Sequence, residues 1–547
     1  MKKDVNDINR GADNRPIVLL ILDGWGLSPA WGGNPLSMNN PKNINRLWRE
    51  FPHAVLQAFS VFFKDKSNIV KIANSEVGHA SIGAGIMVKP DLLDINEAIE
   101  TKLFYKNKVL KNAANNVRKN NSSLHLIGLF SDGSVHSHID HLFALLDFAK
   151  AENIKNVFVH LITDGRDAGS NEAIVFLKKL EDKINQLGIG RVASICGRDL
   201  AMDRNDNIDR TAQTYRVQVL GEGNYNTQAG KALAEGYQGG YNDETFLPTA
   251  IVDNNGKPIG IVKDGDSVIF YNFRADRARQ LTRAYTDPKY FQRFGIWRKY
   301  PKRKIYFVTM TDYGLKDKNI KVIFPAAKIN FSLPRILAEN GFKQLHLAET
   351  EKYAHVTYFL NGGFEEPLKG EKRIIFKSDT RDADQNPKMQ TERVAQKIIQ
   401  AVKKKEFDFI VANLPNVDMI GHTGNILAAG EGIKTIDNAV GKISDEVLHT
   451  GGTLIITADH GNGELMLSLQ KGDPETLHSL NPVPFILISP KFRKNLLKSA
   501  VSQPSNLLSR ILETKHTLAN VAPTILELLG IRKPPQMTGH SILRELE

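Results

Sequence analysis

The chain has 547 residues, which is too long for a single hydrophobic core, so two or more domains are expected. Hydrophobic residues make up 41% and charged residues 24%, as in ordinary globular proteins, and the single cysteine, Cys196, excludes an intrachain disulfide framework. Lysine and arginine exceed aspartate and glutamate by 72 − 60 = 12, an excess that suits either nucleic acid or a small anionic substrate.

The basic residues occur in short, scattered runs such as 403–405, without a nucleic-acid recognition motif, so we expect no nucleic-acid partner. The apolar run Ile17–Leu22 is too short to span a membrane and lacks a signal-peptide cleavage pattern. Together with the cysteine content, this favours a cytoplasmic protein with no membrane contact. We expect a monomer that acts on a small molecule.

Short apolar runs rich in β-branched residues alternate with helix-like segments along the chain. This alternation predicts an α/β fold with largely parallel sheets. The predicted strands are Ile17–Leu22, Leu124–Leu129, Val157–Ile162, Val268–Phe273, Ile305–Val308, Phe407–Ala412, Leu454–Thr457 and Phe485–Ile488. Carboxylates follow several of them, and ligands of open α/β sheets bind beyond the carboxyl ends of strands. We therefore expect a ligand-binding site in these loops.

Two proline-marked stretches, Val88-Lys89-Pro90 and Phe324-Pro325, are candidate domain crossings. If both are crossings, residues 89–324 form a domain inserted into a discontinuous outer domain of residues 1–88 and 325–547.

The stretch Ala73-Asn74-Ser75-Glu76-Val77-Gly78-His79 is a short polar turn that carries a candidate nucleophile. Ser75 is also a candidate helix N-cap, with Asn74 as a competitor for that role. Ser75 is a candidate nucleophile because aspartates and histidines elsewhere in the chain could bind a pair of metal ions. A hydroxyl beside such a metal pair is a common nucleophile.

Aspartate and histidine recur at spacings typical of metal ligands. Asp418 and His422 are four residues apart, which places both on one face of a helical turn. The remaining candidates are Asp23, Asp459, His460 and His478. Three carboxylates, three imidazoles and a serine suit two adjacent divalent ions, and this mixture favours Mn²⁺ or Zn²⁺ over Ca²⁺.

The middle of the chain is rich in arginines that follow predicted strands. Guanidinium groups bind phosphate and carboxylate through two parallel hydrogen bonds, so the set indicates a pocket for a small dianion. For any single arginine, the alternative is an ion pair with an acidic residue at the protein surface. Arg274 and Arg277 are three apart and are expected to share a helical face. The others are Arg166, Arg198 and Arg204. His136 and His138 raise the alternative of a third metal site, although no cysteine or carboxylate pattern supports it.

Six segments of the chain, taken in order, resemble the signature set of the cofactor-independent phosphoglycerate mutases of the alkaline-phosphatase superfamily. The segments are Asn74–His79, Ser131–His138, Asp164–Asp167, Phe270–Arg274, Ala348–Tyr353 and Thr457–Asn462, and the match extends to Met537-Thr538-Gly539. The resemblance implies two α/β domains, with an alkaline-phosphatase-like domain split by an inserted transferase domain. Ala73 departs from the family, which usually has glycine there. An N-terminal tail ahead of Pro16 and a 503–515 insertion depart as well.

The resemblance also implies roles for individual residues. Ser75 would be the phosphorylated nucleophile, beside Lys352, and Asp167 would handle the hydroxyl proton of glycerate. Asp418, His422 and His478 would hold one divalent ion, and Asp23, Ser75, Asp459 and His460 the other. The ions are expected to be Mn²⁺, with Mg²⁺, Co²⁺ and Zn²⁺ as alternatives. The substrate would be bound by His136, Arg166, Asp167, Arg198, Arg204, Arg274, Arg277 and Lys352.

The expected activity is the interconversion of 3-phosphoglycerate and 2-phosphoglycerate, in glycolysis and gluconeogenesis, without 2,3-bisphosphoglycerate. A metal-dependent phosphatase of the same superfamily is the alternative, and it would need the metal ligands but not the arginines. A basic nucleic-acid-binding protein is a second alternative, which the net charge allows and the intact metal ligands disfavour.

Overall fold

The computed structural model describes residues 15–63, 69–287, 289–294, 302–325, 328–379, 383–468, 472–493 and 514–546. The chain divides into two compact units. Unit 1 comprises Met1–Pro90 and Ala327–Glu547, and unit 2 comprises Asp91–Ala326. Pro90 and Pro325, the prolines that mark the predicted crossings, lie beside these two divisions. Residues 1–14 of the N-terminal tail and 503–513 of the predicted insertion lie outside the described residues.

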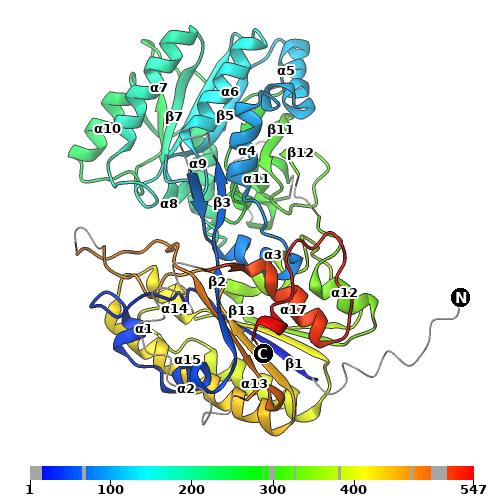
Figure 1. Cartoon of the computed structure of the whole chain (residues 1–547). Coiled ribbons are helices and arrows are strands. Elements are labelled where there is room, and N and C mark those ends of the chain that lie inside the picture. Colours follow the sequence, from blue (N-terminus) through cyan, green and yellow to red (C-terminus); the bar gives the residue numbers. More distant parts are fainter. Residues whose placement is uncertain are drawn as a thin grey trace, which may run out of the picture. The chain divides into compact units, whose positions relative to one another are not determined.

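Unit 1 is built on an eight-stranded, mostly parallel sheet (Figure 1). Its strand order is β14 (Glu371–Phe376), β13 (Gln344–Glu349), β15 (Phe409–Leu414), β1 (Ile17–Leu22), β16 (Thr453–Thr457), β17 (Val483–Ile488), β2 (His53–Gln57) and β18 (His516–Thr517). The central strand β1 is buried along its whole length, as its unbroken apolar sequence predicts for a parallel strand covered on both faces. Strand β17 runs antiparallel to both β16 and β2. A separate antiparallel pair is formed by β3 (Ser60–Phe63) and β4 (Ile69–Ile72).

Helices pack on both faces of this sheet (Figure 1). One group consists of α2 (Lys42–Glu50), α13 (Thr391–Lys404), α14 (Asn416–Gly421) and α15 (Ile426–His449). The other consists of α3 (Ser75–Ala84), α12 (Leu333–Glu339) and α17 (Val521–Leu528). The core of unit 1 therefore lies in two layers, with β1 between them.

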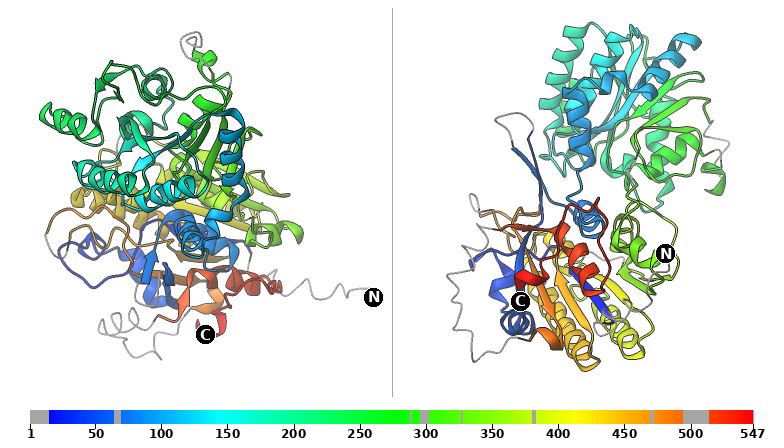
Figure 2. Two further views of the ribbon diagram at one scale, coloured as in Figure 1. Left: turned by 90° about the horizontal axis from the view of Figure 1, so that it is seen from above. Right: turned by 45° about the vertical axis from the view of Figure 1, so that its right-hand side comes forward.

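Unit 2 has its own eight-stranded sheet, in which β9 runs antiparallel to β7 and the other pairs are parallel (Figure 2). Its order is β12 (Ile320–Phe324), β11 (Tyr306–Thr311), β10 (Ser267–Phe270), β5 (Leu124–Phe130), β6 (Val157–Thr163), β7 (Arg191–Gly197), β9 (Thr249–Ile251) and β8 (Asn224–Asn226). The helices that accompany it include α5 (Lys108–Asn120), α6 (Ile139–Ala151), α7 (Ala173–Leu187), α9 (Ile208–Val219) and α11 (Arg279–Thr286). The α/β class predicted from the sequence is confirmed, and each of the eight predicted strands overlaps an observed one.

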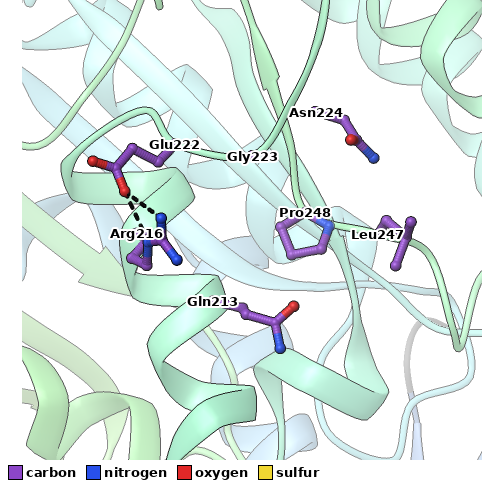
Figure 3. Close-up of a pocket in the computed structure, with 7 residues that line it drawn as sticks. All are labelled: Gln213, Arg216, Glu222, Gly223, Asn224, Leu247 and Pro248. Carbon is purple, nitrogen blue, oxygen red and sulfur yellow. Dashed lines mark hydrogen bonds and ion pairs between the residues drawn. The ribbon is translucent and has the colours of Figure 1, made fainter.

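A pocket of ≈ 210 Å³ in unit 2 is lined by Gln213, Arg216, Glu222, Gly223, Asn224, Leu247 and Pro248 (Figure 3). Arg216 already pairs with Glu222, 2.8 Å from Nε to Oε2. No residue singled out from the sequence lines this pocket, so the candidate site lies elsewhere. None of the helices among the described residues combines the length and the apolar character that crossing a membrane requires.

Leu19 lies fully buried on β1, whereas Leu427 at the start of α15 is 90% exposed. Leu19→Ala should lower the free energy of unfolding of unit 1 by about 2–5 kcal/mol, because the substitution leaves a cavity at the centre of the sheet. Leu427→Ala makes the same chemical change at the surface and should shift it by less than about 0.5 kcal/mol. Denaturant unfolding followed by circular dichroism measures both. Equal effects would contradict the placement of β1 at the core.

Candidate active site

The register of the unit 1 sheet brings three chain segments together at one edge. Leu22 of β1 pairs with Leu414 of β15, and Ile21 pairs with Thr457 of β16. The segments after these three strands carry Asp23, Asp418 and Asp459. The three carboxylates are buried, so the loops at the carboxyl ends of the strands form the floor of a site.

Two glycines allow these loops to approach one another. Gly24 has φ +75°, and a Cβ on it would lie 2.9 Å from the Asp418 backbone. A Cβ on Gly78, in α3, would lie 2.5 Å from the carbonyl oxygen of Asp459. A larger residue at either position would push the carboxylates apart.

Ser75 is the first residue of α3 and not part of an open polar turn as the sequence suggested. Asn74 is the N-cap, and its side chain accepts a hydrogen bond from the backbone N–H of Val77 at 2.9 Å. The competition between the two residues is thus resolved in favour of Asn74. The hydroxyl of Ser75 is left free to point at the carboxylates.

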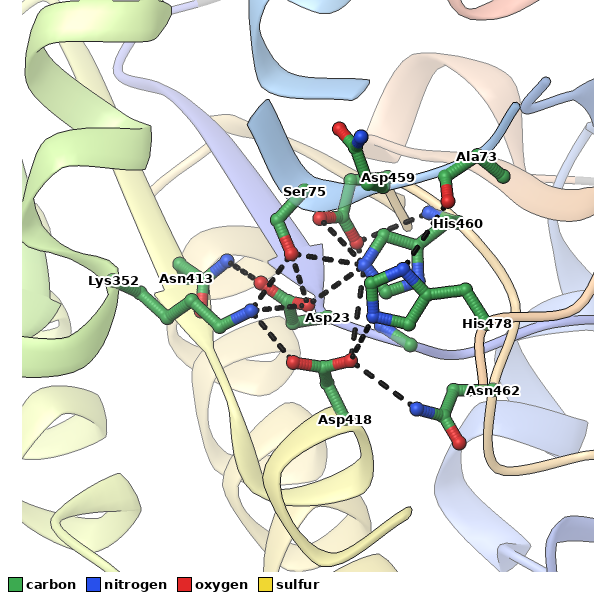
Figure 4. A network of polar contacts seen from close by, with 12 residues as sticks. Asp23, Ala73, Ser75, Lys352, Asn413, Asp418, Asp459, His460, Asn462 and His478 are labelled. Atoms are coloured by element: carbon green, nitrogen blue, oxygen red, sulfur yellow. Dashed lines mark hydrogen bonds and ion pairs between the residues drawn. The ribbon is translucent and has the colours of Figure 1, made fainter. Parts of the chain in front are cut away.

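The Ser75 hydroxyl lies at the centre of the polar network (Figure 4). Its Oγ is 2.9 Å from His460 Nε2 and 3.3 Å from Asp23 Oδ1. Lys352, in the short 3₁₀ segment Thr350–Lys352 after β13, donates to Ser75 Oγ at 2.8 Å. The same ammonium donates to Asp23 at 2.9 Å and to Asp418 at 2.7 Å.

Electrostatics keep this lysine charged. Burial favours its neutral form, but the neighbouring charges of Asp23 and Asp418 outweigh burial and raise the pKa of Lys352 above its ordinary range. Burial also opposes ionisation of Asp418, but the Lys352 charge holds the pKa of Asp418 well below its usual value. Lys352 therefore acts as a fixed positive charge on the hydroxyl and not as a proton acceptor.

The three predicted histidine ligands present the same ring atom to the site. In each, Nδ1 faces a backbone carbonyl, which can only accept, so Nδ1 carries the proton and the neutral ring leaves Nε2 bare. The pairs are His422 with Thr476 at 2.9 Å, His478 with Ala73 at 3.1 Å, and His460 with Gly461 at 3.2 Å. A proton fixed on Nδ1 by a carbonyl is the arrangement typical of metal-ligating histidine.

These bare nitrogens converge on carboxylate oxygens. Nε2 of His478 and Nε2 of His422 are 3.2 Å apart, and they lie 3.2 and 3.4 Å from Asp418 Oδ1. His460 Nε2 lies 3.4 Å from Asp23 Oδ1, and Asp459 Oδ2 lies 3.5 Å from His460 Nε2 and 3.2 Å from His79 Nδ1. Lone pairs at these distances repel one another unless a proton or a metal cation lies between them. The residues therefore fit divalent metal ions, and two of the donor groups that could hold a metal are Asp418–His422–His478 and Asp23–Asp418–His460.

Four residues that the sequence did not assign position the ligands. Asn413 donates to Asp23 Oδ2 at 2.7 Å, and Asn462 donates to Asp418 Oδ1 at 3.3 Å. His79 Nδ1 lies 2.9 Å from the carbonyl of Ser75 and 3.2 Å from Asp459 Oδ2, so it faces the site with a proton and not with a lone pair. The buried carboxylate of Glu464 accepts from the backbone N–H of Gly26 and of Asn462, both at 3.0 Å.

These residues carried little signal in the sequence. His79 belongs to the Ser75 stretch, and its four-residue spacing from Ser75 is a signal of a shared helical face. Asn413 is a strand residue whose neighbours are apolar, and nothing in its spacing points to the site. Asn462 and Glu464 lie just beyond the Asp459-His460 pair. Only the fold of the loop, which the sequence does not show, places their side chains beside the metal ligands.

A second constellation lies in unit 2, at the carboxyl edge of its sheet. Arg198 is buried directly after β7 and donates to Asp167 Oδ2 at 2.7 Å as well as to Asp164. Burial raises the pKa of Asp167, although the charge of Arg198 opposes the shift. Arg166 is more exposed and lies 3.7 Å from Glu244.

The remaining arginines gather around Asp276. Arg204 donates to it at 3.2 Å, Arg274 lies at 3.4 Å and His136 at 3.6 Å. Burial would raise the pKa of Asp276, but the charge of Arg274 and its neighbours holds it far below its usual range. Burial and then the charges of Arg204 and Arg198 lower the pKa of Arg277 to about 10, so these cations lie close enough to repel one another.

One expectation about this region needs correction, and one alternative finds no support. Arg274 and Arg277 do not share a helical face, because they lie in the extended segment and turn before α11, which begins at Arg279. His138 does not join His136 in a metal site. Its ring caps α6 by accepting from the N–H of Asp140 at 3.2 Å, and no metal-ligating group among the described residues includes either histidine.

Comparison with known proteins identifies the family. A family model described as "BPG-independent PGAM N-terminus" matches residues 95–315. The 2,3-bisphosphoglycerate-independent phosphoglycerate mutase of Clostridium acetobutylicum is 42% identical over 531 residues, which is 96% of this chain and 99% of that protein. That of Acetivibrio thermocellus is 40% identical over 530 residues, again 96% of this chain and 99% of that protein.

A solved structure agrees with these relatives. The crystal structure of Leishmania mexicana phosphoglycerate mutase at low cobalt concentration superposes with a TM-score of 0.80 at 28% identity, covering 96% of this chain and 97% of that one. The two α/β units, the donor set around Ser75 and this full-length similarity lead to one conclusion. The chain belongs to the 2,3-bisphosphoglycerate-independent phosphoglycerate mutases.

Proposed function

We propose that this chain interconverts 3-phosphoglycerate and 2-phosphoglycerate through a phosphoserine at Ser75. The observation that carries the proposal is the Ser75 hydroxyl, which receives a hydrogen bond from a charged lysine among three carboxylates and three imidazoles. The phosphoryl group passes from one hydroxyl oxygen of the substrate to Ser75 Oγ, and then from Oγ to the other hydroxyl of the same glycerate.

The ligands divide into two sets in this proposal. Asp418, His422 and His478 would hold one ion, while Asp23, Ser75, Asp459 and His460 would hold the other. Ser75 Oγ and His460 Nε2, which lie 2.9 Å apart, would both belong to the second set. Mn²⁺ is the metal we favour, because its preferences match a mixed oxygen and nitrogen set. When bound, the ions supply charge that lowers the pKa of the serine hydroxyl and that neutralises the phosphoryl oxygens.

The protein side chains make Ser75 a nucleophile in three ways. Lys352 donates to Oγ and so favours the alkoxide over the hydroxyl. Asp23 Oδ1 accepts from the hydroxyl at 3.3 Å and fixes its direction. Ser75 also begins a ten-residue helix, whose N-terminus stabilises the negative charge that phosphorylation brings.

The arginine set of unit 2 retains the glycerate while the phosphoryl group is on Ser75. Arg198, Arg204, Arg274 and Arg277 offer guanidinium groups for the carboxylate and phosphate, and His136 lies among them. Asp167 takes the hydroxyl proton of glycerate, and burial moves its pKa upward in the direction that suits a general base. Because Ser75 belongs to unit 1 and the arginines to unit 2, the proposed reaction needs groups from both units.

Two observations favour a mutase over a phosphatase. The chain resembles mutases along its whole length, and unit 2 carries the arginine set that hydrolysis does not need. The cytoplasmic location and the monomeric state remain part of the proposal and rest on the sequence.

Ser75→Ala should abolish mutase activity, because it removes the atom that accepts the phosphoryl group. A coupled enolase assay with manganese and without bisphosphoglycerate measures the loss. Ser81→Ala, on the same helix, removes a hydroxyl that accepts from the N–H of Val88 and should leave most activity in place. Turnover by metal-loaded Ser75→Ala at the wild-type rate would contradict the assignment.

His422→Ala and Asp459→Ala should each cost one equivalent of manganese, at different sites, because their side chains belong to different ligand sets. Elemental analysis of the purified variants measures the stoichiometry, and their combination should bind neither ion. The division of ligands is wrong if either single variant keeps both ions or loses both.

Manganese affinity should fall as the solution becomes acidic. Burial lowers the pKa of His422, but the charge of Asp418 outweighs burial and raises it. This ring therefore gains a proton at a higher pH than His478, whose pKa burial lowers to about 4. Below the pKa of His422 the apparent Kd for Mn²⁺ should rise about tenfold per pH unit, and more Mn²⁺ should move the acid limb of activity to lower pH. An acid limb that is independent of manganese would point to the substrate or Asp167 instead.

Arg274→Ala should convert part of the mutase flux into hydrolysis, because glycerate would leave before the phosphoryl group returns to it. The quantity to measure is inorganic phosphate released per 2-phosphoglycerate formed. Arg210→Ala is the matched control, since Arg210 pairs with Asp199 outside the set at 2.6 Å and should not change the ratio. An unchanged ratio with a reduced rate in Arg274→Ala would mean that Arg274 binds substrate without retaining the intermediate.

A further inference from the structure

The C-terminal part of unit 1 carries another group of metal-ligating side chains, outside the candidate active site. It consists of His516 on β18, His540 in the loop after α17, and Glu545 in the short helix α18 (Leu543–Leu546). His516 Nε2 lies 3.3 Å from Glu545 Oε2, and His540 Nε2 lies 3.4 Å from Oε1 of the same carboxylate. The ligand atoms lie within 4.8 Å of one another.

We propose that His516, His540 and Glu545 bind a zinc ion. Two imidazoles and one glutamate are a donor set typical of zinc, with water in the fourth position. Zinc bonds to nitrogen and oxygen of about 2.0–2.1 Å place neighbouring ligands of a tetrahedral site about 3.3–3.4 Å apart. Each imidazole nitrogen lies at about that separation from one oxygen of Glu545, His516 from Oε2 and His540 from Oε1, so a small rotation of the carboxylate would let one oxygen serve both.

The surroundings allow both rings to ligate through Nε2. Asn520 Nδ2 lies 3.2 Å from His540 Nδ1, but it has the His540 carbonyl as an acceptor at 2.8 Å. The His540 side chain is 58% exposed, so its ring can turn slightly and keep on Nδ1 the proton that ligation through Nε2 requires. Nδ1 of His516 has no hydrogen-bond partner and is equally able to carry the proton. Without an ion, the same geometry is a pair of imidazole N–H groups donating to one carboxylate.

An ion here would join the edge strand β18 to the segment that holds the end of α3. His516 pairs with Leu56 at the edge of the sheet. His540 follows Gly539, whose N–H donates to the carbonyl of Gly85, the C-cap of α3, at 2.9 Å. Zinc would thus fasten the edge strand to the segment that packs against the far end of the Ser75 helix. The site is structural in this proposal and does not touch the candidate active site.

The test compares zinc bound by the full-length, manganese-loaded protein with zinc bound by the double variant His516→Ala/His540→Ala. Both are equilibrated with ZnCl₂, passed through a desalting column and analysed for zinc and manganese. The wild type should retain one zinc equivalent more than the double variant, whatever zinc exchanges into the active site of both. His449→Ala, which removes an exposed histidine at the end of α15, is the control and should retain as much as the wild type.

Equal zinc in the wild type and the double variant would overturn the proposal, as would an equal loss in His449→Ala. Because the double substitution also removes packing at the sheet edge, Glu545→Gln provides a second route. It keeps the shape of an exposed side chain and removes its charge, so it should lose the extra zinc and the zinc-dependent rise in melting temperature that the wild type shows. A Glu545→Gln protein with the full zinc content would equally overturn the proposal.

Discussion

Three buried carboxylates around one serine hydroxyl are the constraint on which the rest of unit 1 depends. Asp23 lies 3.3 Å from the Ser75 hydroxyl, and Asp418 and Asp459 connect to it through Lys352 and His460. All three are buried, where bulk water cannot solvate their charge. Such a cluster needs either positive charge inside it or a proton on one carboxylate, and burial together with the charge of Asp459 raises the pKa of Asp23. One ammonium, from Lys352, is present, and three imidazoles turn their bare nitrogens to the remaining space. The metal ions of the proposed mechanism would therefore offset buried negative charge as well as serve the chemistry.

Unit 2 also gathers like charges at one edge of its sheet, but there the charges are positive. Its parallel strands end in arginines, and Asp164, Asp167 and Asp276 hold these cations in place. Burial, and then repulsion from the neighbouring arginines, lowers the pKa of Arg277, and this crowding of cations is the counterpart of the crowded carboxylates in unit 1. A dianionic ligand would relieve this repulsion, as divalent cations would relieve the other. Each sheet thus places its charged groups by one rule, the alignment of parallel strands at their carboxyl ends.

The sequence predicted features that depend on local patterns. Unbroken apolar runs such as Ile17–Leu22 are strands, and the four-residue spacing of Asp418 and His422 is one helical turn. Prediction from the sequence failed where tertiary contacts determine the structure. Strand β13 was missed because Gln344, His346 and Glu349 interrupt its apolar pattern, although all three are buried. The helix expected at Arg274 and Arg277 begins later, at Arg279. Asn413 and Glu464 gain their roles only from loops that are distant in the sequence.

The central claim is that the phosphoryl group resides on Ser75 during turnover. Acid quenching of the manganese-loaded enzyme during reaction with 3-phosphoglycerate, followed by peptide mass spectrometry, tests it most directly. We expect phosphate on the peptide that contains Ser75, formed equally from 2-phosphoglycerate and absent without substrate. Phosphate on a histidine or on any other residue, with Ser75 unmodified, would contradict it.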